Sequence, residues 1–171
     1  GNFATSDLNF DIGDTDQGIV HVIGPELGLT LPGTTLLCTD SHTCTHGALG
    51  ALAWGVGQTD ALHILATQSI VQGKPKSMRI RLDGTLPSSV FAKDVILAVI
   101  GRFGAGAGVG YAVEFCGSAV QAMLMEERLT LCNMAVELGS RTGIIAPDLV
   151  TADFLHGRPY APSGALWDTA V

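Results

Sequence analysis

Two thiols, a carboxylate, two imidazoles and several hydroxyls crowd into nine consecutive residues, Cys38-Thr-Asp-Ser-His-Thr-Cys-Thr-His46. A carboxylate and an imidazole can hold or transfer a proton, and thiols and imidazoles can bind a metal ion. The apolar run Thr34-Thr-Leu-Leu37, bounded by Pro32-Gly33, predicts a short buried strand just before the stretch. Open α/β sheets bind ligands outside the carboxyl ends of their strands. We therefore expect a functional site here.

Two other interpretations of this stretch stay open from spacing alone. It could be a polar, threonine-rich turn with incidental histidines. It could also be a zinc site, because Cys38, His42, Cys44 and His46 are all of ligand type. Zinc modules usually pair their thiols about two to four residues apart and add a second pair further on, whereas here the cysteines and histidines interleave. We expect no metal ligands among these residues.

Three polar residues outside the stretch stand out in apolar surroundings. His21 lies in the run Gly18-Ile-Val-His-Val-Ile23, which could form a short helix or a strand, and a lone histidine in such a run is more often structural. Asn133 and Glu137 are four residues apart in a predicted helix over 130–139, so their side chains would share one face. On an otherwise apolar helix, such a pair is either a surface pair or part of a buried network or site wall.

The composition is that of a compact, apolar, acidic protein. The 171 residues suit one domain, 1–171, with a sizeable core; 47% are hydrophobic and 15% are charged. The net charge of −7 argues against nucleic acid or an anionic membrane as a partner. No apolar run reaches the length of a membrane span, and no signal peptide is expected. The four cysteines fit reduced thiols, which favours the cytoplasm or an organelle.

Helical and strand patterns alternate along the chain. Helices are predicted over 61–72 with Thr59-Asp60 as cap, over 95–103 with most faces buried, over 119–125 with Ser118 as cap, over 130–139 with Gly139 as stop, and around 153–155. Strands are predicted over 34–37, 77–83 and 111–116. Residues 1–13 and the segment from 146 to 171 show little regular pattern. The order predicts a three-layer α/β/α domain with a mostly parallel or mixed sheet.

The glycine-rich segment Gly104-Ala-Gly-Ala-Gly-Val-Gly110 does not match a nucleotide-binding motif. The dinucleotide fingerprint needs glycine at its first, third and sixth positions, and no register of this segment supplies all of them. The segment is not followed by the Gly-Lys-Ser/Thr of a phosphate-binding loop. We expect a tightly packed loop that leads into the strand 111–116.

Several motifs together resemble one known family. Asp40-Ser-His-Thr43 after a strand, followed by Gly47 and Gly50, resembles the signature of the aconitase superfamily of iron–sulfur hydro-lyases. The resemblance extends to the large subunits of its isopropylmalate dehydratase group, through the strings Gly18-Ile-Val-His-Val-Ile-Gly-Pro-Glu26, Pro32-Gly-Thr-Thr35, Lys74-Pro-Lys-Ser-Met-Arg79, Ala92-Lys-Asp94, Cys132-Asn-Met134 and Gly157-Arg-Pro-Tyr-Ala-Pro162. It covers nearly the whole chain.

The resemblance implies a function and a role for each candidate residue. A [4Fe–4S] cluster with one open iron would be the electrophile for the leaving hydroxyl of a 2- or 3-hydroxy dicarboxylate. Asp40 and His42 would hold the water or hydroxyl, and His21 and Glu137 would line the pocket as further catalytic residues. Substrate contacts would come from Ser41, Thr43 and Asn133. The base would be a serine of a separate small, swivelling-domain subunit.

The sequence departs from the family pattern at the cluster. The family's cluster cysteines lie in a Cys-Thr-Asn segment and a Cys-x-x-Cys, and neither occurs here. An upstream histidine of the family's acid pair is also missing. We therefore expect an internal fragment of a longer large subunit, inactive by itself, that needs the rest of that subunit and the small subunit.

Two questions are left open by the resemblance. The substrate could be isopropylmalate, in leucine biosynthesis, or homoaconitate or dimethylmalate. The chain could also be a non-catalytic truncated or assembly module. In the catalytic case, we expect His21, Asp40, His42, Asn133 and Glu137 to converge on one face of the fold.

Overall fold

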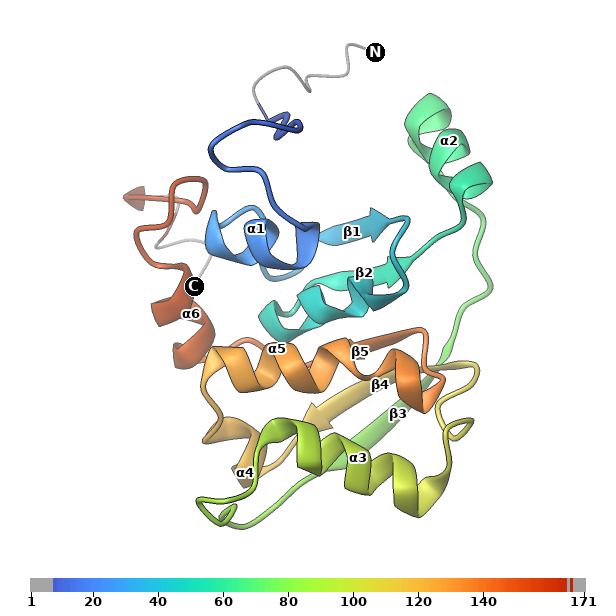
Figure 1. Cartoon of the computed structure of the whole chain (residues 1–171), viewed down its shortest axis with the longest axis vertical. Coiled ribbons are helices and arrows are strands. Elements are labelled where there is room, and N and C mark those ends of the chain that lie inside the picture. The colour runs from blue at the N-terminus through green and yellow to red at the C-terminus, as the bar shows by residue number, and fades with distance from the viewer. Residues whose placement is uncertain (1–7, 166, 168–171) are drawn as a thin grey trace.

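The computed structural model describes residues 8–165 and 167, in which strands and helices alternate (Figure 1). The predicted irregular start and the trailing segment therefore lie partly outside the described residues. The strands are β1 (Thr35–Cys38), β2 (Leu52–Gly55), β3 (Lys76–Arg81), β4 (Tyr111–Cys116) and β5 (Thr142–Ile144). The α-helices are α1 (Val20–Glu26), α2 (Gln58–Thr67), α3 (Ala92–Phe103), α4 (Ser118–Gln121), α5 (Met125–Asn133) and α6 (Leu149–Leu155). Two 3₁₀-helices, η1 (Ser41–Leu49) and η2 (Val136–Leu138), complete the set.

The strands pair in parallel, which confirms the predicted α/β class, and they form two sheets. β1 pairs with β2, and β3, β4 and β5 form a second sheet in that order. η1 contacts β2 of the first sheet, β5 of the second sheet and helix α5. The amide of Ile145, just after β5, donates to the carbonyl of Gly47 in η1 at 3.0 Å. The reactive stretch of the sequence therefore connects the two sheets.

η1 replaces the loop that the sequence suggested after β1. Its N-cap is Asp40, whose side chain accepts the backbone N–H of His42, and its C-cap is Gly50 at φ 76°. Within η1, the hydroxyl of Thr45 donates to the carbonyl of His42 at 2.6 Å. Gly47 packs so closely on the backbone of Gly143 that any Cβ would collide with it. Threonine hydroxyls and close backbone packing thus stabilise a 3₁₀-helix that is longer than most.

The predicted helix over 130–139 is wrong in its bounds. α5 begins at Met125, where the carboxylate of Glu127 accepts the backbone N–H of Leu124 at 2.9 Å, and it ends at Asn133. Glu137 lies in the separate element η2, which ends at Gly139 with φ 86°. Asn133 and Glu137 therefore do not share one helix face. Gly139 ends η2 rather than the predicted helix.

Four other predicted helices differ from the structure. α2 begins earlier and ends at Thr67, with Gly57 as N-cap and no side-chain cap from Thr59-Asp60. α3 buries one face only, since Leu97 is 47% exposed. α4 ends at Gln121, and Ser118 is its first residue rather than its cap; the Ser118 hydroxyl instead accepts the N–H of Gly84. α6 begins at Leu149 because Asp148 caps it.

The strand predictions are closer, and the ambiguous segment 18–23 is resolved. β4 has the predicted bounds 111–116, and the glycine-rich segment before it is a loop. β1 is half-buried rather than buried, because its two-stranded sheet leaves Thr35 exposed. β2 and β5 were not predicted. Segment 18–23 leads into α1, a helix that places His21 in its first turn.

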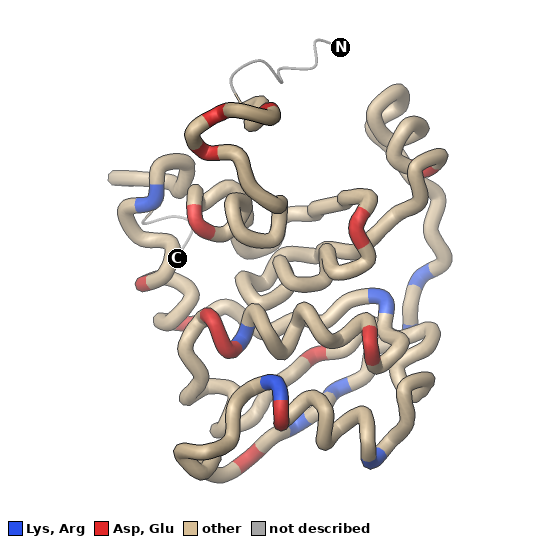
Figure 2. The backbone as a smooth tube through the Cα atoms, viewed as in Figure 1, with Lys and Arg blue, Asp and Glu red and all other residues tan. Residues whose placement is uncertain are grey.

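Charged groups are spread over many elements (Figure 2). Lys and Arg occur on several helices, strands and loops, with Asp and Glu between them, rather than on a single stripe. In the described part of the chain, no helix is both long and apolar enough to cross a membrane.

The hydrophobic core is built mainly from α3, α5, η1 and β4, with Ile96, Phe115 and Leu131 almost fully buried.

Candidate functional site

Asp40 lies at the junction of β1 and η1, and it contacts two histidines. Its Oδ1 accepts the backbone N–H of His42 at 2.7 Å and lies 3.0 Å from Nε2 of His21. The contact with His21 has ion-pair distance without the alignment of a hydrogen bond. His21 and, next, the His42 amide hold the pKa of Asp40 below its ordinary value, because both favour the ionised carboxylate. Asp40 is therefore a carboxylate at neutral pH.

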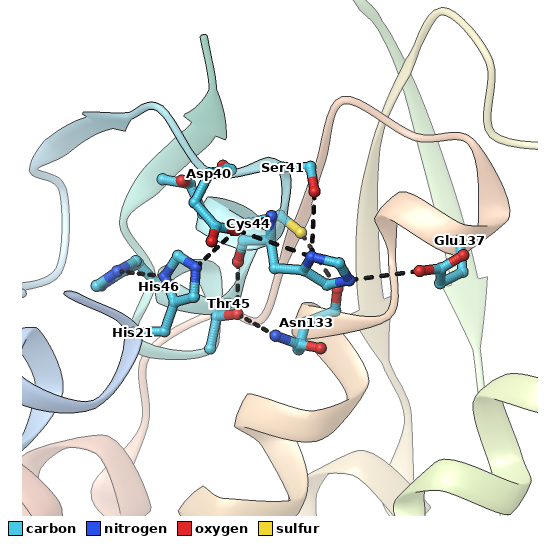
Figure 3. A network of polar contacts seen from close by, with 10 residues as sticks. His21, Asp40, Ser41, Cys44, Thr45, His46, Asn133 and Glu137 are labelled. Carbon is cyan, nitrogen blue, oxygen red and sulfur yellow. Dashed lines mark hydrogen bonds and ion pairs between the residues drawn. The ribbon is translucent and has the colours of Figure 1, made fainter. Parts of the chain in front are cut away.

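His42 lies between the carboxylates of Asp40 and Glu137, two residues that Figure 3 labels. Its Nε2 lies 3.3 Å from Oε1 of Glu137 in η2, and its Nδ1 lies 3.8 Å from Oδ1 of Asp40 and 3.1 Å from the Ser41 hydroxyl. The His42 side chain is 37% exposed, and both carboxylates are more than half exposed. A carboxylate at each end can hold the imidazole in one orientation.

Asn133 joins the same network from the end of α5. Its side-chain amide donates to the hydroxyl of Thr45 at 2.8 Å, and its backbone carbonyl accepts from the thiol of Cys44 at 3.4 Å. Asn133 and Glu137 thus reach η1 from two elements, although they do not share a helix. These contacts join His21, Asp40, His42 and Glu137 directly, and Asn133 reaches the same stretch through Thr45.

Thr43 has different surroundings from the other candidates. It is fully buried, and its hydroxyl donates to the carbonyl of Asp40 at 2.6 Å. This bond closes the first turn of η1. The burial favours a structural role over the substrate contact that the sequence suggested. Ser41, by contrast, is exposed and borders a cavity of about 580 Å³ that also contacts Val56, Val136 and Arg141.

The structure adds two residues, His46 and Thr30, to which the sequence analysis assigned no role in catalysis or substrate binding. His46 is fully buried, with Nε2 3.4 Å from Nδ1 of His21 and Nδ1 2.7 Å from the hydroxyl of Thr30. Burial and, next, the nearby His21 lower the pKa of His46 to about 4, so it is neutral at neutral pH. Its place in the reactive stretch was a signal, but nothing in the sequence marks Thr30, which is sixteen residues away.

The cysteines do not form a site for a metal cluster. Cys44 and Cys132 are buried, and burial raises the pKa of the Cys44 thiol to about 11, which disfavours the thiolate that binds iron. Cys38 and Cys116 end strands of different sheets. Among residues 8–165 and 167, no three His, Cys, Asp or Glu side chains are placed to hold a metal ion. A [4Fe–4S] cluster needs convergent thiolates, and the described cysteines do not fit it.

The zinc alternative is not supported either, because three of its four residues have separate partners. Cys44 donates to the Asn133 carbonyl, His42 faces Glu137, and His46 binds Thr30. What the arrangement can do is hold and move protons. Two carboxylates and three imidazoles form a continuous series from Glu137 through His42, Asp40 and His21 to His46. Such a series at the end of a strand is suited to acid–base chemistry.

The chain belongs to the aconitase family. Residues 2–171 match the aconitase family (aconitate hydratase). The chain is 60% identical over 162 residues to 3-isopropylmalate dehydratase large subunit 1 of Bradyrhizobium diazoefficiens, covering 95% of this chain and 34% of that protein. It is 57% identical to the 3-isopropylmalate dehydratase large subunit of Roseiflexus castenholzii, with the same coverage. The chain thus spans about a third of the length of these relatives.

Proposed function

We propose that this chain is part of a hydro-lyase that interconverts 2-isopropylmalate and 3-isopropylmalate by dehydration and rehydration, in leucine biosynthesis in the cytoplasm. The observation that carries the proposal is the pair of carboxylate–imidazole contacts, Asp40 with His21 and Glu137 with His42. Similarity to two isopropylmalate dehydratase large subunits supports the proposed substrate class. Because the chain covers a third of these relatives, we propose that it acts only with the rest of a large subunit and with a small subunit.

The proposed division of labour follows from the exposure and contacts of each side chain. His42 can give a proton to a departing hydroxyl or take one from water, while Asp40 and Glu137 stabilise its imidazolium. Ser41 is exposed beside the cavity and can donate its hydroxyl to a substrate carboxylate. Asn133, held by Thr45, would orient the substrate at the other side of His42.

A second catalytic centre must complete the reaction. Aconitase-family enzymes carry an iron–sulfur cluster, which supplies the electrophile for the hydroxyl group when it is bound. The described cysteines do not fit such a cluster, so we place its ligands in the part of the relatives' length that this chain does not span. The base that removes the carbon-bound proton is proposed to come from the small subunit.

The proposal is tested with a substrate panel. The chain, within its assembled large subunit and with the small subunit, would be assayed with 2-isopropylmalate, homoaconitate and dimethylmalate. We expect kcat/KM for 2-isopropylmalate to exceed the others by at least about 10-fold, since a pocket that fits one apolar group rejects a misfit by that order. Preference for another acid would contradict the proposed substrate and assign that acid instead. Turnover of none of the three acids would contradict the hydro-lyase function.

A further inference from the structure

A buried imidazole lies directly behind the proposed site. His21 faces Asp40 with Nε2 and faces His46 with Nδ1, so the two neighbours contact opposite nitrogens of one ring (Figure 3). The rings of His21 and His46 meet edge to face, with centroids 5.5 Å apart. The other nitrogen of His46 lies 2.7 Å from the hydroxyl of Thr30, which is also fully buried. Thr30 and His46 therefore form a pair that solvent does not reach.

Helix α1 is shaped around this pair. A Cβ at Gly24 would lie 2.8 Å from Cε1 of His46 and 2.9 Å from the hydroxyl of Thr30. The backbone carbonyl of Gly24 also accepts the N–H of Thr30 at 3.0 Å. The glycine thus lets the helix that carries His21 approach His46 and Thr30 closely.

The charge of Asp40 favours one position for the proton of His21. A bare Nε2 at 3.0 Å from an ionised carboxylate would place two acceptors face to face, so the carboxylate favours hydrogen on Nε2, although the contact lacks the alignment of a hydrogen bond. In neutral His21, Nδ1 is then an acceptor. His46 can donate its Nε2–H to that nitrogen, and its own Nδ1 can accept the hydroxyl hydrogen of Thr30. The donors then all point one way, from Thr30 to Asp40.

The same pair also suits a protonated His21. An imidazolium donates from both nitrogens, so Nε2 of His46 must accept and its Nδ1 must carry the hydrogen. Thr30 can accept that hydrogen, because a hydroxyl rotates to donate or to accept. His46 has no other charged neighbour that would fix its tautomer in the described contacts. The pair can therefore follow His21 through a change of charge without moving a side chain.

We propose that His46 and Thr30 are positioning residues, which keep a proton on Nε2 of His21 and hold that ring against Asp40. The structural part of the proposal stands by itself. Its effect on turnover rests on the proposed hydro-lyase function, and the two parts are tested by separate measurements.

The first measurement is ¹⁵N NMR of the histidine rings in this chain, which shows which nitrogen of His21 carries the proton near neutral pH. His46→Leu removes both ring nitrogens at little change in volume, and Thr30→Val removes only the hydroxyl. We expect Nε2–H in the wild type and a mixture of tautomers in both variants, whereas His46→Gln, whose amide can still donate, should retain Nε2–H. If His46→Leu does not fold, Thr30→Val decides the outcome. An unchanged His21 tautomer in the folded variants overturns the proposal.

The second measurement is turnover of 2-isopropylmalate by the assembled enzyme. Residues that orient a reacting group through a hydrogen bond typically contribute roughly 10-fold to 100-fold to activity. We expect kcat to fall by that factor in His46→Leu with KM little changed, and to recover in His46→Gln. Full turnover with an altered tautomer would overturn the positioning role in the reaction. If the wild-type enzyme turns over none of the acids, the proposed function is contradicted. If the His21 tautomer is nevertheless altered in the variants, the positioning of His21 by His46 and Thr30 still holds.

Discussion

Oδ1 of Asp40 caps η1 and also faces His21. By accepting the N–H of His42, it fixes the start of the 3₁₀-helix that carries His42 and His46. By facing Nε2 of His21, it gains a partner that favours its ionised form. The charge at the end of β1 and the start of η1 therefore depend on the same atom. A substitution at His21 should change the pKa of Asp40 without changing the backbone.

His21→Leu is expected to raise the pKa of Asp40 toward its ordinary value of 3.8, since His21 is the largest cause of the lowered pKa. A carboxyl with a lowered pKa in the folded protein contributes stability that is present above the ordinary pKa and is lost as pH falls through the folded value. The variant should therefore lose this contribution at a higher pH than the wild type. Carboxyl ¹³C NMR during an acid titration measures the shift, with His63→Ala as control. An Asp40 pKa that is the same with and without His21 would contradict the described contact.

At the scale of elements, Arg128 connects α5 to the start of α6. Its side chain is fully buried, and it makes two hydrogen bonds of 2.7 Å to the carboxylate of Asp148, which also caps α6. The carbonyls of Gln121 and Met123 accept from the same guanidinium. A buried charge with its only described carboxylate partner removed is strongly unfavourable.

Asp148→Asn should reduce the free energy of unfolding by about 3 kcal/mol, because the buried Arg128 loses its countercharge while Asn retains the capping oxygen. The estimate is at the low end of the usual range since Asp148 is 36% exposed. Arg128 lowers the pKa of Asp148, so the contribution is present above 3.8 and disappears as pH falls through the lower folded value. Urea unfolding at several pH values measures it. Glu114→Gln, which breaks the exposed Arg79 pair, is the matched control and should cost far less, because solvent screens an exposed pair. Equal losses in the two variants would refute the role of the buried pair.

Local patterns predicted some elements well and others poorly, for identifiable reasons. β4 is a mostly apolar run between Gly110 and Gly117, and its bounds were predicted correctly. β2 and β5 are only four and three residues long, and they become strands through pairing with distant partners. The start of α5 was predicted at Thr130, but Thr130 lies inside the helix, where its hydroxyl donates to the carbonyl of Glu126. The helix starts earlier, where the side chain of Glu127 accepts the backbone N–H of Leu124.

At the scale of the whole molecule, residues that are far apart in sequence form one network. The signature Asp40-Ser-His-Thr43 predicted where the site lies, and family resemblance supplied His21, Asn133 and Glu137. The sequence could not show that η1 lies between two sheets, which is what brings α1 and α5 to it. Nor could it show Thr30 behind His46. Long-range packing, rather than local propensity, decides both features.

The central claim is that Asp40 and His42 carry out proton chemistry on a hydroxy acid. Asp40→Asn tests it most directly, because Asn keeps the size of the side chain and the cap of η1 and removes only the charge. Acid–base groups contribute roughly 10²-fold to 10⁴-fold to rate, so turnover of 2-isopropylmalate by the assembled enzyme should fall by about that factor. KM should change less, and His63→Ala, on the exposed helix α2, should stay within a few-fold of wild type. Nearly full turnover in Asp40→Asn would contradict the account, since Asp40 would then be only the cap of a structural turn.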